Sequence, residues 1–184
     1  MSISGIYKEN KEVIGFLLRF LGVYIFGNLI YGFAVTQYRP VPDPITILVA
    51  RQSSVVIQAM GYSVQTYTSK VHETVLLTLK GGPVVLEVFE GCNGVNVMII
   101  FSAFLIAVGK APKTMVLVLA AGTLIIHLIN LLRIGGLFWV AMNRPHDFYF
   151  IHKYFFTAVL YVLIFILWTV WLYILLPRIN DKTR

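Results

Sequence analysis

The chain has 184 residues, of which 58% are hydrophobic and only 12% are charged, and its formal net charge is +7. Soluble domains carry about 25% charged and about 45–50% apolar residues, so this composition indicates a single membrane domain over residues 1–184. The basic residues form no stripe and stand at the ends of apolar runs, which argues for lipid and against nucleic acid as a partner. A single cysteine, Cys92, excludes an intrachain disulfide framework and cysteine-based zinc sites.

The first predicted element is a membrane-spanning helix. Residues 13–35 are apolar except for Arg19 and Asn28. About 23 residues that rise about 1.5 Å each cross a hydrocarbon core of about 30 Å. The prolines of residues 39–44 then end the helix.

Residues 45–60 are predicted to form a helix that lies on the membrane interface. Asp43 fits a helix cap because Pro44 follows it at the first helical position. The segment contains Arg51 and is too polar to span a membrane. An apolar face is expected from five of its residues: Ile45, Leu48, Val49, Val56 and Met60.

Three short runs rich in Val, Thr, Tyr and Leu follow, at residues 62–68, 74–80 and 84–89. Gly81-Gly82, between the last two, is a hairpin-turn signal. We therefore predict a small β meander outside the membrane. With the interfacial helix it forms an extracytoplasmic segment of residues 37–91, which leads directly to Cys92.

Three further spans are predicted, at residues 93–108, 114–132 and 150–176. The expected fold is thus an all-α integral membrane protein with about four transmembrane helices, an interfacial helix and a small β meander. Helix rise places Cys92 about 27 Å from Lys110 and Arg133 about 30 Å from Lys113. Because His152 opens the last span, Cys92, Arg133 and His152 are expected at nearly one depth, at the outer ends of three helices.

The positive-inside rule predicts that both termini are cytoplasmic. This orientation leaves Cys92, Arg133 and His152 on the extracytoplasmic side. It places eight basic residues inside, against seven spread over longer outer segments, and those inside are Lys8, Lys11, Arg19, Lys110, Lys113, Arg178, Lys182 and Arg184.

Cys92 has two interpretations. A lone cysteine in an apolar protein is most often a small buried hydrophobe. Here Gly91 and Gly94 flank it at the start of a predicted helix, where the helix dipole lowers a thiol pKa and favours a nucleophilic thiolate. Arg133 also fits an interfacial anchor, and His152 fits part of an aromatic and basic belt.

Several neighbouring polar residues have candidate supporting roles. Glu90 pairs with Arg133 or caps the second span, and Asn130 lies on the same helical face as Arg133 and holds it or binds substrate. His146-Asp147 orients His152, or His146 is itself the base. Backbone N–H groups near Asn93 and Gly94 are expected to help bind an oxyanion. The histidines lack metal-binding spacing, so neither a metal nor a cofactor is expected.

Three motifs carry a family resemblance: Glu90-Gly-Cys92-Asn-Gly94, Asn130-Leu-Leu-Arg133, and His146-Asp147 followed by His152. In this order they resemble the exosortase/archaeosortase family of membrane cysteine transpeptidases, above all its compact exosortase F-type members. The resemblance implies that Cys92 is the nucleophile, Arg133 the family's arginine, and His152 or His146 the third member.

The same resemblance implies a place and a class of substrate. It implies a bacterial inner-membrane enzyme that cleaves and transfers proteins with a C-terminal signal, which comprises a short motif, a transmembrane helix and a basic cluster. The acceptor nucleophile is left open. Two other functions are also open: a purely hydrolytic intramembrane protease, and a non-enzymatic scaffold whose meander and interfacial helix bind a partner.

Overall fold

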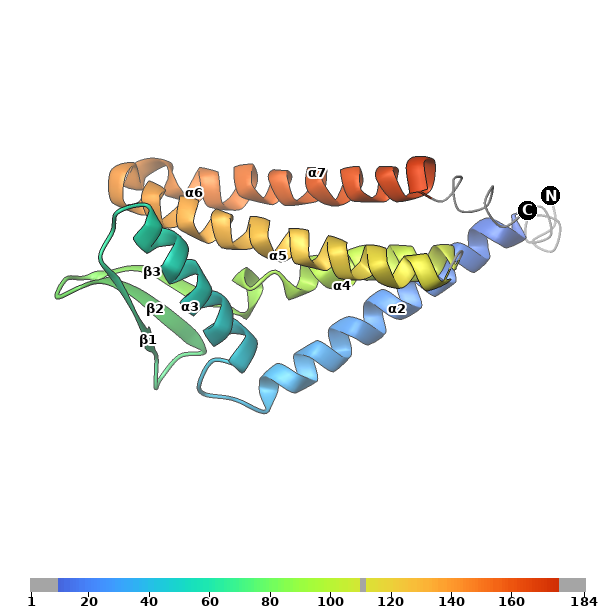
Figure 1. Ribbon diagram of the computed structural model, residues 1–184. Helices are drawn as coiled ribbons and strands as arrows, with labels where there is room; N and C mark the ends of the chain where they lie inside the picture. Colours follow the sequence, from blue (N-terminus) through green and yellow to red (C-terminus); the bar gives the residue numbers. More distant parts are fainter. Residues whose placement is uncertain (1–9, 110–111, 176–184) are drawn as a thin grey trace.

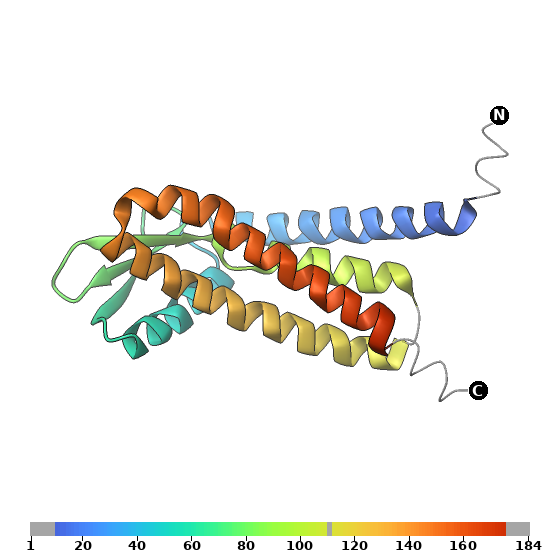
Figure 2. The same cartoon turned by 90° about the horizontal axis from the view of Figure 1, so that it is seen from above.

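The computed structural model describes residues 10–109 and 112–175. Apolar helices lie lengthwise beside one another, with successive helices running in opposite directions, and a small sheet with one short helix lies at one end of them (Figures 1 and 2). The beginning of the first helix and the end of the last helix lie at the other end. The predicted end of the last span at residue 176 lies outside the described residues, as do Lys8, Lys110, Arg178, Lys182 and Arg184.

Among the described residues, three helices are long and apolar enough to cross a membrane: Lys11–Thr36, Lys113–Asn143 and Pro145–Tyr173. The first is α2, and the second lies within α5, Pro112–Asn143. The helix α4, Val95–Val108, is apolar but has only 14 residues, about 21 Å of rise. The last helix is continuous through four parts, which are α6 (Phe148–Phe150), the π-helical turn η3 (Ile151–Phe155), α7 (Phe156–Thr169) and η4 (Val170–Leu175).

The predicted end of the third span is wrong. Instead of ending before Arg133, α5 continues to Asn143, so Arg133 lies inside the helix and not at its outer end. Gly135 and Gly136 do not break the helix because neighbours pack closely on them. A Cβ atom on Gly135 would lie 3.2 Å from the Val56 side chain, and one on Gly136 would lie 2.8 Å from the Phe156 ring.

The predicted interfacial segment is helix α3, Pro44–Ala59, and its cap is confirmed. The Asp43 side chain accepts hydrogen bonds from the backbone N–H groups of Ile45 and Thr46. Ile45, Leu48 and Met60 of the predicted apolar face are exposed, and the contact of this face with the membrane interface stays a prediction. The helix buries a different stripe against the sheet and α5, made of Thr46, Val49, Ala50, Ser53, Ser54 and Ile57.

The β meander is confirmed. Strands β1 (Val64–Thr68), β2 (Thr74–Leu79) and β3 (Val84–Phe89) form an antiparallel sheet in the order β1-β2-β3. The predicted turn closes with a 2.9 Å hydrogen bond from the Gly82 N–H to the Leu79 carbonyl.

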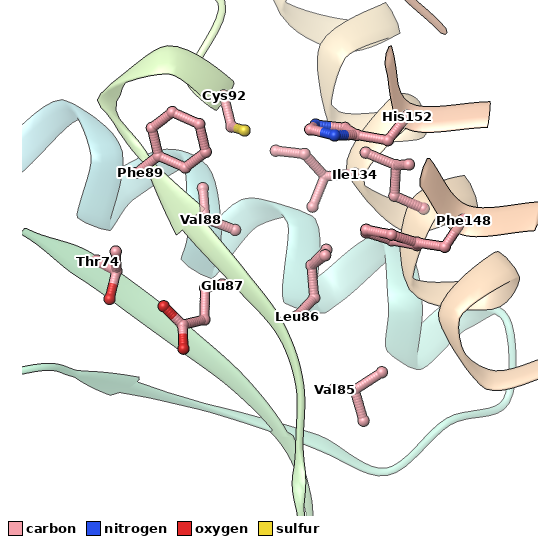
Figure 3. Close-up of a pocket in the computed structure, with 11 residues that line it drawn as sticks. Thr74, Val85, Leu86, Glu87, Val88, Phe89, Cys92, Ile134, Phe148 and His152 are labelled. Carbon is pink, nitrogen blue, oxygen red and sulfur yellow. The ribbon is translucent and has the colours of Figure 1, made fainter. Parts of the chain in front are cut away.

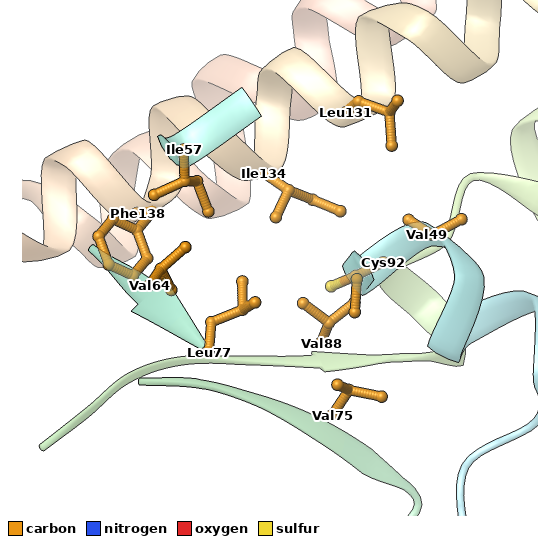
Figure 4. Packing of buried hydrophobic residues seen from close by; sticks show 11 residues of the cluster. Val49, Ile57, Val64, Val75, Leu77, Val88, Cys92, Leu131, Ile134 and Phe138 are labelled. Carbon is orange, nitrogen blue, oxygen red and sulfur yellow. The ribbon is translucent and has the colours of Figure 1, made fainter. Parts of the chain in front are cut away.

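One face of this sheet packs against α3 and α5 and forms a core that includes Cys92 (Figure 4). Val75, Leu77 and Val88 contribute from the sheet, and Ile134 and Phe138 from α5. A second core lies between α4, α5 and the last helix and contains Phe101, Ile126, Ile164 and Trp171. The segment that carries Cys92 thus joins the sheet to the helices.

Candidate active site

Cys92 lies on a short connection between β3 and α4. A 3₁₀ turn η1, Glu90–Cys92, follows the strand, and Gly94 caps α4 with φ +85°. This φ lies in the left-handed region that glycine tolerates best. A side chain at Gly94 would also lie 3.2 Å from the Asn130 amide. The shape of this turn therefore requires the glycine at position 94.

Hydrogen bonds hold both sides of the turn. Asn130 of α5 donates a 2.8 Å hydrogen bond from Nδ2 to the Cys92 carbonyl oxygen. Asn93 donates to the Tyr31 hydroxyl of α2 (2.6 Å) and to the Thr46 hydroxyl of α3 (2.9 Å). Buried side-chain networks of this kind fix a conformation when their polar groups are satisfied. Three helices therefore position the backbone of Cys92.

Arg133 is a buried cation, with 9% of its surface exposed. Its Nη1 donates to Asn130 Oδ1 at 3.4 Å, and its Nε has no hydrogen-bond partner among the described residues. Within that part of the chain the ion pair within 4 Å joins Arg39 to Glu73, so Glu90 does not pair with Arg133 as predicted. Glu90 does not cap α4 with its side chain either. Burying a charge without a partner is costly, so Arg133 has the character of a group held for a ligand.

The thiol of Cys92 is buried, with 6% of the residue exposed. Burial raises its pKa above the ordinary value, and the nearby Glu90 carboxylate acts in the same direction. The positive charge of Arg133 and the backbone N–H of Phe89 oppose this rise. The sequence predicted a lowered pKa, whereas burial of the thiol raises it; Cys92 lies before α4, which begins at Val95.

Two cavities meet at Cys92 and His152. The first, about 360 Å³, is mainly apolar and lies between β3 and the helices α5 and α6. In Figure 3 the sulfur and the His152 imidazole point toward one another across its upper end. The second, about 420 Å³, is lined by both residues and by Arg133. The predicted cysteine, arginine and histidine therefore line one cavity, although they come from different elements.

His152 and the alternative histidine differ in position. The His152 ring stacks on Phe148, with centroids 5.7 Å apart, and reaches both cavities from the π-helical turn η3. His146 and Asp147 are exposed in the 3₁₀ turn η2, Pro145–Asp147, and line neither cavity. Among the described residues, no three His, Cys, Asp or Glu side chains form a metal-binding cluster.

The sequence did not single out several residues at this site. Tyr31 and Thr46 anchor Asn93, and their only signal is a hydroxyl within an apolar span and one three residues after the helix cap Asp43. Phe89, Tyr149 and Thr157 line the second cavity together with Lys153, whose ammonium donates to the Tyr149 hydroxyl at 2.6 Å. Aromatic and hydroxyl residues are common in membrane helices, so these positions carried no distinctive pattern.

The transmembrane exosortase family model matches residues 12–172 of this chain. The chain belongs to the exosortase family. Comparisons with curated proteins and with solved structures found no match. Exosortase membership, together with three helices able to cross a bilayer, identifies a membrane protein with a transpeptidase-type function in general.

The match extends over every element that builds the exosortase site. It begins in α2, which supplies Tyr31, and ends beyond His152. It also spans the sheet, so the small extramembrane part belongs to the matched region together with the helices.

Proposed function

We propose that this exosortase is a cysteine transpeptidase that cleaves a membrane-presented protein and transfers it to an acceptor. The observation that carries the proposal is that Cys92, Arg133 and His152 line one cavity. A thiol, a fixed cation and an imidazole are the groups that nucleophilic acyl transfer uses. We assign Cys92 as nucleophile, His152 as acid and base, and Arg133 as stabiliser of the oxyanion.

Acyl transfer begins with loss of the Cys92 proton. Because burial raises the pKa of this thiol and so favours its protonated form, His152 accepts the proton as the sulfur attacks the substrate carbonyl carbon. The tetrahedral oxyanion is stabilised by the guanidinium of Arg133, which lines the cavity. Collapse breaks the C–N bond, and the imidazolium gives its proton to the leaving amine. The product is a thioester on Cys92.

Resolution of the thioester reverses these proton transfers. An acceptor amine attacks the thioester carbonyl and loses a proton to His152. The C–S bond then breaks, and the departing sulfur takes this proton, which regenerates the thiol. Attack by water in place of the amine makes the same chain a hydrolytic protease. Both reactions pass through the same acyl-enzyme and differ only in whether an amine or water attacks its thioester.

We also propose four membrane crossings, with both termini cytoplasmic and the site extracytoplasmic at a bacterial inner membrane. The four helices α2, α4, α5 and α7 alternate in direction (Figure 1). The basic residues Lys11, Arg19 and Lys113 lie near the helix ends remote from the sheet. Basic residues favour the cytoplasmic side, so the sheet and Cys92 belong on the other side. Substrates are proteins with a C-terminal signal of short motif, transmembrane helix and basic cluster.

The decisive experiment compares wild-type and Cys92→Ala chains in cells. We expect unprocessed substrate to accumulate in Cys92→Ala cells and a hydroxylamine-sensitive acyl group on Cys92 in wild-type cells, detected by mass spectrometry. Added amine distinguishes transpeptidation from hydrolysis by the product formed. Full processing by Cys92→Ala would instead indicate the scaffold function.

The orientation has a separate test in a Cys92→Ser background. A new cysteine replaces exposed His72 of the sheet or exposed Lys113 at the start of α5. A membrane-impermeant maleimide added to spheroplasts is expected to label His72→Cys at once and Lys113→Cys only after permeabilisation. The opposite pattern would overturn the orientation.

A further inference from the structure

The apolar cavity follows one edge of the sheet. It is lined by five consecutive residues of β3, Val85–Phe89. Consecutive side chains of a strand point to opposite faces, so a cavity that touches all five runs along the strand edge and not over one face. Among the described residues β3 pairs only with β2, so this edge is unpaired.

The register shows which backbone groups face the open edge. Along β2, the Lys80 N–H bonds to β1 through the Ser63 carbonyl, whereas the Leu79 N–H bonds to the Pro83 carbonyl just before β3. Along an antiparallel strand, the N–H and C=O groups of successive residues point alternately to the two neighbouring sides. The backbone groups of the even-numbered residues of β2 therefore point toward β1. Leu76 lies opposite Glu87 and Thr74 opposite Phe89. The N–H and C=O groups of Glu87 and Phe89 therefore point away from β2, toward the cavity.

The sulfur of Cys92 lies on this edge. Cys92 lines the cavity together with Val85–Phe89, and the backbone N–H of Phe89 lowers the pKa of its thiol, which agrees with the outward direction assigned from the register. Glu87 is the next outward-facing residue, and two residues of a strand span about 6.6–6.8 Å. A peptide that is hydrogen-bonded to the backbone of Glu87 therefore reaches the Cys92 thiol within its next two residues.

We propose that the substrate binds as an extended peptide that adds to β3 as a fourth strand, with the N–H and C=O of Glu87 as its main-chain partners. Strand addition of this kind supplies affinity through the backbone. It delivers the scissile carbonyl to Cys92, between the sulfur and His152. The inference rests on the proposed function, because it gives that enzyme a mode of substrate recognition.

The lining also defines the side chains of this peptide. One side of the cavity is apolar, with Ile134 and Phe148 (Figure 3), and Leu137 also lines the cavity. The Glu87 carboxylate lies on the other side of the strand in the same view. Opposite charges on neighbouring strands attract and like charges repel. The occupant is therefore an extended peptide that is apolar toward the helices and carries a basic, and not an acidic, residue opposite Glu87.

The test uses Cys92 as the only cysteine of the chain. The full-length protein in detergent is alkylated with the peptide probe acetyl-Leu-Leu-Leu-Ala chloromethyl ketone and, separately, with iodoacetamide. The thiolate displaces chloride from the chloromethyl ketone and iodide from iodoacetamide, and mass spectrometry gives both rates. Their ratio isolates peptide recognition from the intrinsic reactivity of the thiol.

Glu87→Pro removes the edge-facing N–H without removing a bond to β2, a change that edge strands tolerate. We expect the rate ratio to fall about fivefold to tenfold, the effect of one lost hydrogen bond. Thr66→Pro is the matched control, because Thr66 lies opposite Leu77 and faces the other edge of the sheet. It is expected to leave the ratio within about twofold of the wild-type value. An unchanged ratio in Glu87→Pro would overturn the proposal.

N-methylation of the probe, one amide at a time, provides an arm that needs no variant. Strand pairing uses alternate amides, so alternate N-methyl groups should slow wild-type labelling while the intervening ones do not. A uniform effect at every amide would also overturn strand addition. Replacing the Leu residues one at a time by Lys or Glu should show faster labelling with Lys than with Glu at one position. Glu87→Gln should abolish that preference, and its persistence would contradict the assigned contact.

The same data separate this inference from the proposed function. If Cys92 is no nucleophile, neither reagent labels it and no acyl-enzyme forms in cells. If Cys92 is the nucleophile but the substrate binds elsewhere, iodoacetamide still labels Cys92 and the acyl-enzyme still forms. The ratio of the two labelling rates is then unchanged by Glu87→Pro and by N-methylation of the probe.

Discussion

The amide of Asn130 donates a 2.8 Å hydrogen bond to the carbonyl oxygen of Cys92. Its other end, Oδ1, accepts from Arg133 Nη1. One buried side chain thus couples the backbone of the candidate nucleophile to the candidate oxyanion stabiliser. This explains why the Asn-x-x-Arg spacing suits the site, because residues three apart share a face of α5.

Asn130→Leu is expected to destabilise the protein by about 1–3 kcal/mol, since it leaves the buried Cys92 carbonyl without its partner. It should also change the rate at which iodoacetamide labels Cys92, because the turn and Arg133 lose a common anchor. Thermal unfolding in detergent and labelling kinetics measure the two effects. Asn143→Leu, a change to an exposed amide on the same helix, is the control. Equal effects of both variants would remove the positioning role of Asn130.

The pH dependence of Cys92 alkylation gives a second prediction. Burial raises the pKa of the folded thiol, so labelling by iodoacetamide should have its midpoint above the value for a free thiol. Arg133→Gln removes the charge that opposes this rise and should move the midpoint further upward, whereas Arg133→Lys should move it less. A wild-type midpoint below the free-thiol value would contradict the assignment.

The same shift sets a sign for stability. Between the pKa of the unfolded thiol and the higher pKa of the folded thiol, the unfolded state binds fewer protons. The contribution of Cys92 to stability is therefore complete below the unfolded pKa and is lost as pH rises through the folded pKa. Cys92→Ala should remove this part of the pH dependence of the unfolding temperature.

Local signals in the sequence predicted much of this fold. Asp43-Pro44 predicted the start of α3, and Gly81-Gly82 predicted the β2–β3 hairpin. These features are set within a few residues, by capping and by turn geometry. The order of Cys92, Arg133 and His152 also predicted their convergence in one cavity.

Features that depend on distant neighbours were missed. The third span was predicted to end at residue 132, but α5 continues to Asn143, and Val56 and Phe156 pack on Gly135 and Gly136. Likewise, the burial of Thr46 and Ser53 of α3 was not predicted, because contacts with the sheet and α5 determine which face of the helix is buried. The direction of the Cys92 pKa shift was not predicted for the same reason. Burial raises this pKa, and burial depends on tertiary packing, which motif spacing does not show.

Gly94→Ala tests the left-handed turn beside Cys92. The substitution places a Cβ atom at φ +85° and within 3.2 Å of the Asn130 amide. Gly61→Ala is a matched control, since Gly61 has φ +95° but open space around its Cβ position. Backbone strain of about 1–2 kcal/mol applies to both variants. Only Gly94→Ala should lose more stability than this, and only Gly94→Ala should slow Cys92 labelling. Equal unfolding temperatures for the two variants would show that the Asn130 contact does not constrain the turn.

Replacing His146 and His152 in turn identifies the histidine that transfers protons. His152→Gln removes an imidazole that lines both cavities, whereas His146→Gln alters an exposed ring that lines neither. General acid–base groups contribute about 10²–10⁴-fold, so His152→Gln should slow formation of the Cys92 acyl-enzyme by about that factor and His146→Gln by less than about twofold. Pulse labelling of substrate in cells measures both. Because Phe148 stacks on His152, His152→Phe preserves the packing without the base and should be as slow as His152→Gln. Normal acylation in His152→Phe, or a large loss in His146→Gln, would reassign the role to another residue.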